Sequence, residues 1–224
     1  MIRLDEIGVD RAIVCPAKPR GYHLAAANYA VAEAVALGDG RLTGLARVDP
    51  LLGDDACAEL ERALGDLGLR GLFLHPWEET FRIADSCVLP VVDTARRFGV
   101  PVIVAAGYPW LSEALQVGAL ARRFPDVPFV ATNGLQLNIS GLGQMDAELA
   151  LAGAVNLCVQ TAGVYREDFL QGVVSRFGSR RVLYASSYPL LDPRLEIRRV
   201  QWAGFSEGEA AALLGGNARA LFGF

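Results

Sequence analysis

Two histidines, His23 and His75, are the side chains of this sequence best suited to exchange protons near neutral pH. The second opens the segment "HPWEE" (residues 75–79), which brings an imidazole, an indole and two carboxylates together. His75 is therefore predicted to be catalytic, as a general base, or to anchor an acidic ligand. The alternative is a scaffold histidine bonded to the backbone beside a structural proline. Glu78 and Glu79 are predicted to be solvated loop charges.

Further polar side chains follow other apolar runs and are predicted to bind a substrate. They are Arg20, Asn133, Gln160, Ser187 and Tyr188. An arginine can clamp a carboxylate through two parallel hydrogen bonds, although a plain surface loop is the alternative for Arg20. Neutral amides cannot act as bases, but they hydrogen-bond neutral or carboxylated ligands. No G-x-S-x-G elbow surrounds Ser187, so pocket lining is favoured over a nucleophilic role.

These residues lie at the ends of β-rich runs that alternate with helical patterns. Seven such runs occur, at residues 11–16, 41–49, 71–76, 101–107, 128–134, 156–163 and 181–189. Continuous apolar runs indicate strands buried on both faces of a parallel sheet. A repeated strand and helix favours either a closed (β/α) barrel or an open doubly wound sheet. No GxGxxG follows the first run, so the barrel is preferred, with its chemistry at the carboxyl ends of the strands.

Composition restricts the class of protein. The 224 residues are 52% hydrophobic and 21% charged, which is typical of a globular chain. No linker divides the sequence, so residues 1–224 are predicted to form one domain. A net charge of −4 argues against nucleic-acid binding. No apolar stretch is long enough to predict a membrane span. Four separated cysteines and no export signal predict reduced thiols in the cytoplasm.

Several stretches, in order, resemble the amidohydrolase-2 family, which includes aminocarboxymuconate-semialdehyde decarboxylase. They are "IGVDRAIVCP", "GLARVDP", "LGLRGLFLHP", "LPVVDTARRFGVPVIVAAGYP", "LARRFPDVPFVATNG", "RVLYASSYPLLDP" and "LLGGNARALFG". The resemblance covers nearly the whole chain. It implies a TIM-like (β/α) barrel of the metal-dependent hydrolase type, and a hydrolase or decarboxylase activity.

The same resemblance shows where this chain departs from the family. The family's Asp-x-His-x-His strand precedes the point at which this sequence begins to match. Ala105 occupies the position of a histidine ligand in the family. Thr132 replaces the histidine of the family's "AHxG", and Ser187 replaces the aspartate of its "GSDYP". Zinc normally takes about three protein ligands from His, Asp, Glu or Cys. The resemblance therefore predicts an incomplete or distorted barrel of about seven parallel strands, with no metal and no cofactor.

Together these observations predict an amidohydrolase-related protein with a degenerate, metal-free site that binds or transforms a small organic acid or aromatic metabolite. Whether the chain is an enzyme stays open. One alternative is a noncatalytic partner or regulatory subunit, and another is a metal-dependent hydrolase or decarboxylase with ligands that the family does not use. A barrel short of one strand exposes unpaired edges, which predicts a homodimer.

Overall fold

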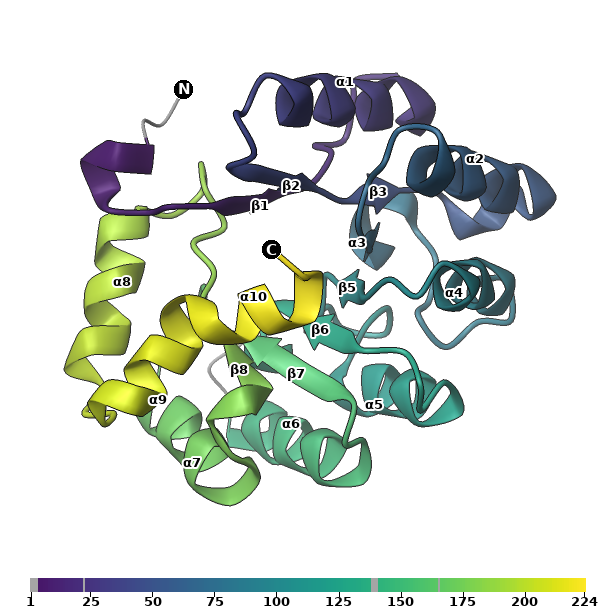
Figure 1. The fold of residues 1–224 in the computed structure, drawn as a ribbon. Helices are drawn as coiled ribbons and strands as arrows, with labels where there is room; N and C mark the ends of the chain where they lie inside the picture. Colours follow the sequence, from purple (N-terminus) through teal and green to yellow (C-terminus); the bar gives the residue numbers. More distant parts are fainter. Residues whose placement is uncertain (1–3, 22, 138–140, 165) are drawn as a thin grey trace.

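The predicted β-rich runs form parallel strands around a common axis (Figure 1) in the computed structural model, which describes residues 4–21, 23–137, 141–164 and 166–224. The strands are β1 (Ala12–Val14), β2 (Leu42–Gly44), β3 (Ala46–Arg47), β4 (Leu72–Leu74), β5 (Val102–Val104), β6 (Phe129–Ala131), β7 (Leu157–Gln160) and β8 (Val182–Leu183). β2 and β3 are the two halves of one extended run, the first pairing with β1 and the second with β4. The predicted barrel of about seven parallel strands is thus confirmed.

The barrel has a seam between β1 and β8. Strands β3 to β8 form one sheet in chain order, while β1 and β2 form a second, and no strand ladder joins β1 to β8 within the described residues. The free edge of β8 is covered by the chain's own C-terminal segment. The Tyr184 amide donates to the Leu213 carbonyl at 2.8 Å, and Asn217 Nδ2 donates to the Val182 carbonyl at 2.7 Å. The predicted incomplete barrel is therefore present.

Helices surround the strands (Figure 1). The longer ones are α1 (Leu24–Ala36), α2 (Asp54–Gly65), α4 (Val88–Arg97), α5 (Ala114–Arg123), α6 (Gly141–Gly153), α7 (Glu167–Phe177) and α8 (Pro193–Trp202). Short helical segments are η1 (Leu4–Ile7), η2 (Pro50–Leu52), α3 (Pro76–Glu79), η3 (Thr132–Leu135), η4 (Ser179–Arg181), α9 (Glu207–Ala211), η5 (Ala212–Gly216) and α10 (Asn217–Phe222). Each amphipathic helix buries its apolar face, as α4 does with Val88, Val91 and Val92. No described helix has both the length and the apolar character needed to cross a bilayer.

A second, smaller apolar cluster fills the inside of the barrel. It consists of Leu45, Phe73, Ile103, Ala105, Val130, Leu183 and Phe222. Phe222 belongs to α10, which crosses the end of the barrel where the strands begin (Figure 1), and Arg11 lies over the ring of Phe224 at 5.5 Å. The C-terminal helix thereby closes one end of the barrel, and we call the opposite end, where the strands finish, the mouth.

Candidate ligand site at the barrel mouth

Four inward-facing residues on consecutive strands form the floor of the mouth. Phe73, Ile103 and Val130 are paired across β4, β5 and β6 and point into the barrel. Because side chains alternate along a strand, the residues two positions further on face the same way. On β4 to β7 these residues are His75, Ala105, Thr132 and Gln160, and we call them the mouth floor. Neighbouring strands are about 4.8 Å apart, so the four side chains are close neighbours.

The His75 imidazole presents a hydrogen-bond donor to the mouth. Its Nδ1 accepts from the Glu78 amide at 3.3 Å and so caps α3. The neutral ring then carries its proton on Nε2. Burial is the largest cause of a lowered pKa for His75, which the carboxylate of Glu78 opposes. The capping bond agrees with the interpretation of His75 as a scaffold residue bonded to the backbone, while the catalytic role of His75 stays a prediction.

Arg47 is the site residue that was not predicted. Its guanidinium is buried, with a side chain only 2% exposed, and donates from Nε and Nη2 to Glu79 at 3.3 and 2.7 Å. It also donates to Glu78 and, at 3.0 Å, to the Pro16 carbonyl. Lys18 donates to the Glu78 carbonyl. One buried cation thus joins α3 to the segment that follows β1.

The two carboxylates on α3 differ from the expectation of solvated loop charges. That expectation is wrong for Glu79, which is 7% exposed and whose pKa is raised by burial despite the hydrogen bonds from Arg47. Glu78 is partly exposed, and its partial burial would raise its pKa. The bond from Arg47 and the nearby His75, Arg47 and Lys18 outweigh that effect and hold the pKa of Glu78 below its usual value. The inward position of Arg47 could have been predicted from the alternation of side chains along the strand, because Arg47 lies two positions after the inward-facing Leu45.

Aromatic side chains form one wall of the mouth. The rings of Trp77 and Tyr108 are stacked at 5.6 Å with an interplanar angle of 14°, and Tyr108 lies 5.5 Å from His75. Phe73 meets His75 edge-on at 5.7 Å. Burial, with Glu78 nearby, raises the pKa of the Tyr108 hydroxyl. We call Phe73, His75, Trp77 and Tyr108 the aromatic wall, which runs from the barrel interior to the rim.

The remaining predicted residues are distributed differently. Thr132 Oγ1 accepts from the Ala106 amide at 3.0 Å and from Asn133 Nδ2 at 3.2 Å. The Gln160 amide is partly exposed and makes no side-chain hydrogen bond within the described ranges. Ser187 is partly exposed, with a positive φ of 46°. Arg20 is exposed after β1, and no hydrogen bond or ion pair between described residues joins it to the mouth floor.

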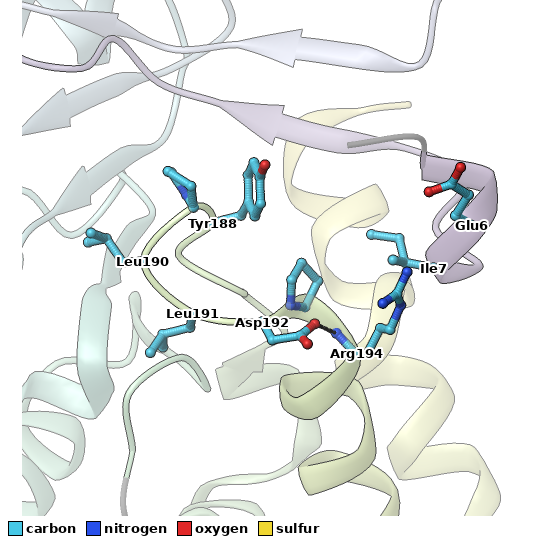
Figure 2. Close-up of a pocket in the computed structure, with 9 residues that line it drawn as sticks. Glu6, Ile7, Tyr188, Leu190, Leu191, Asp192 and Arg194 are labelled. Atoms are coloured by element: carbon cyan, nitrogen blue, oxygen red, sulfur yellow. Dashed lines mark hydrogen bonds between the residues drawn. The ribbon is translucent and has the colours of Figure 1, made fainter. Parts of the chain in front are cut away.

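Tyr188 lines a separate cavity at the seam (Figure 2). The cavity has a volume of about 440 Å³ and lies between η1 and the loop from β8 to α8. Its lining comprises Glu6, Ile7, Tyr188, Pro189, Leu190, Leu191, Asp192, Pro193 and Arg194. Asp192 accepts from the Arg194 amide at 2.9 Å and caps α8. The structure therefore brings His75 and Gln160 into one layer, but gives Tyr188 a place at the seam.

The residues of the mouth floor do not fit a divalent metal. Ala105 is buried and offers a methyl group, and Thr132 uses its oxygen to accept two hydrogen bonds. His75 has its Nδ1 lone pair engaged by the backbone. Across the described part of the chain, no three His, Cys, Asp or Glu side chains are grouped to hold a metal ion.

Comparison with solved structures supports the barrel. One similar structure is 5-carboxyvanillate decarboxylase from Sphingomonas paucimobilis, with 20% identity, a TM-score of 0.79, and coverage of 99% of this chain and 81% of that one. A 2,6-dihydroxybenzoate decarboxylase from Rhizobium gives 18% identity and a TM-score of 0.75, with 98% and 86% coverage. An uncharacterized TIM-barrel protein from Bordetella bronchiseptica gives 17% identity and a TM-score of 0.80, with 98% and 80% coverage. At these identities the likeness shows the fold.

Comparison of the sequence with protein families gives a match to one described as amidohydrolase, over residues 20–224. No curated protein matches the sequence. Because the family match extends over nearly the whole chain and the fold agrees with it, this protein belongs to the amidohydrolase family.

Proposed function

We propose that this protein binds a small organic acid at the mouth floor through neutral hydrogen-bond donors, without a metal, and holds it there for transformation or release. The observation that carries the proposal is the composition of the floor. Ala105 lies between side chains that can donate hydrogen bonds, namely His75 on one side and Thr132 and Gln160 on the other.

Each donor on the floor has a reason to be available. Thr132 Oγ1 already accepts two hydrogen bonds, so its own proton is left to donate. The Gln160 amide has no partner in the described part of the chain, and the neutral imidazole of His75 offers Nε2–H. Hydrogen bonds to a charged acceptor contribute about 1.5–3 kcal/mol each. Thr132 and Gln160 place two such donors beside Ala105, which suits a carboxylate, and His75 offers a third donor to another polar group of the ligand.

The similar structures are consistent with an acid as ligand. Their names describe decarboxylases of 5-carboxyvanillate and 2,6-dihydroxybenzoate, and a further similar structure, a dihydroxybenzoic acid decarboxylase, was solved with bound manganese and the inhibitor 2-nitroresorcinol. We infer that this chain shares the class of ligand but holds the acid with N–H and O–H groups.

Calorimetric titration with benzoate tests the proposal. We expect binding that survives dialysis against EDTA and weakens at least tenfold in Thr132→Val and in Gln160→Leu, because each removes one donor to the carboxylate. Thr43→Val is the matched control, since Thr43 lies in β2 away from the strand ends that form the mouth. Binding that disappears with EDTA, or that is equally strong in all variants, would contradict the proposal.

A second candidate function is that of a noncatalytic partner subunit. The observation in its favour is a set of exposed apolar side chains on loops that follow the strands, namely Leu51, Leu52, Trp77, Trp110, Leu137, Tyr188 and Leu190. Aromatic residues of this kind are enriched in protein interfaces. We propose a homodimer, to be tested by light scattering, in which a monomeric mass at all concentrations would exclude it. Four free cysteines support a reducing compartment, for which we propose the cytoplasm.

A further inference from the structure

The two carboxylate oxygens of Glu78 have different neighbours. Its Oε2 accepts from Arg47, whereas its Oε1 lies 3.9 Å from Nε2 of His75 and accepts no hydrogen bond within the described residues. A separation of 3.9 Å is too long for a hydrogen bond. At this separation, however, a single ligand oxygen can lie about 2.8 Å from both Nε2 and Oε1.

The two groups that face each other require a particular partner. His75 Nε2–H donates and Glu78 Oε1 accepts, so a hydroxyl satisfies both at once. A carboxylate accepts only, and its charge is repelled by Oε1. Two cations lie on this side of the mouth, but Arg47 donates to Glu78, Glu79 and the Pro16 carbonyl, and Lys18 donates to the Glu78 carbonyl. Arg47 therefore keeps the charge of Glu78 in place beside His75.

We propose that Glu78 selects the ligand by the charge of its second polar group. An uncharged hydroxyl is accepted between Glu78 and His75, whereas a second carboxylate is repelled. This inference rests on the proposed function, because it requires that the acid group of the ligand occupy the Thr132 and Gln160 side of the floor. The site then takes a hydroxy acid in preference to a diacid of the same size.

Two probes of nearly equal shape test this selection. 4-(Hydroxymethyl)benzoate and terephthalate differ in whether the second group is a hydroxymethyl or a carboxylate. We expect the native protein to bind the first at least tenfold more tightly, since the carboxylate of Glu78 repels a second carboxylate placed a few ångströms away. Glu78→Gln keeps the shape of the side chain and should reduce the preference to threefold or less. Glu33→Gln removes one exposed carboxylate on α1 and should leave it unchanged.

The possible results separate the two proposals. Equal binding of both probes, or an unchanged preference in Glu78→Gln, overturns the role of Glu78 and leaves the proposed acid site standing. Binding of neither probe overturns the proposed function and this inference with it. A ligand-free NMR titration adds an independent readout, because the carboxylate of Glu78 raises the pKa of His75 and its neutralisation in Glu78→Gln must lower that pKa. An unchanged His75 titration overturns the pairing.

Discussion

The guanidinium of Arg47 and the carboxylate of Glu79 form a two-point ion pair inside the barrel, with N···O distances of 3.3 and 2.7 Å. Both side chains are nearly inaccessible to solvent, at 2% and 4% exposed. The pair ties β3 to α3, and α3 carries Trp77 of the aromatic wall. A structural ion pair thus positions one side of the candidate site.

Removal of this cation should destabilise the fold strongly. Arg47→Met leaves Glu79 buried without a counter-charge, which typically costs about 3–5 kcal/mol. Urea denaturation should show this loss in the free energy of unfolding. The double variant Arg47→Met with Glu79→Leu removes both charges and should recover most of the stability. A double variant no more stable than the single one would contradict this account.

The pH dependence of stability should carry a contribution from His75. Burial lowers the pKa of His75 below the ordinary histidine value of about 6.5, so the unfolded chain takes up the proton more readily than the folded one. The free energy of unfolding should therefore fall as pH drops through about 6.5 towards the lower folded pKa. His75→Asn keeps a capping side chain and should remove that slope, whereas His23→Asn should retain it. The measurement is urea denaturation between pH 5 and 8, and identical slopes in all three proteins would refute the assignment.

Closure of the far end of the barrel should depend on Phe222. The ring is 5% exposed and packs within the barrel cluster, so Phe222→Ala should cost about 3–5 kcal/mol in unfolding free energy. Phe98→Ala is the matched control, because Phe98 is 42% exposed at the end of α4 and its loss should cost much less. Equal losses in thermal or urea unfolding would show that α10 does not seal the barrel.

The turn that carries Tyr108 should tolerate no side chain at Gly107. Its φ is +93°, and an added Cβ would lie 2.5 Å from the Leu137 amide nitrogen. Gly99 also has a positive φ, +65°, but meets nothing within 4 Å, so Gly99→Ala should cost only the conformational strain of about 1–2 kcal/mol. Gly107→Ala should cost clearly more and should also change the near-ultraviolet circular dichroism of the Trp77 and Tyr108 pair. Comparable stability of the two variants would be the contrary result.

The order of strands and helices could be predicted from the sequence because it depends on local patterns. Apolar runs such as 101–107, followed by glycine and proline, identify buried parallel strands wherever they occur. Placing the site at strand ends predicted His75 and Gln160 as site residues, and the register brings them into one layer with Thr132, the neighbour of the predicted Asn133. That Ala105 cannot ligate a metal was equally visible, since residue type alone decides whether a side chain can coordinate.

Tertiary structure alone decided which distant residues meet. Arg47 and Glu79 are 32 positions apart, and a pattern along the chain cannot show that both point to the same side of one strand end. The same holds for α10, whose Phe222 fills the barrel interior. Sequence determined the elements and the chemistry that each strand end offers, because periodicity and residue type are local properties. The folded chain decided burial, pairing and charge balance, because these depend on side chains that only packing brings together.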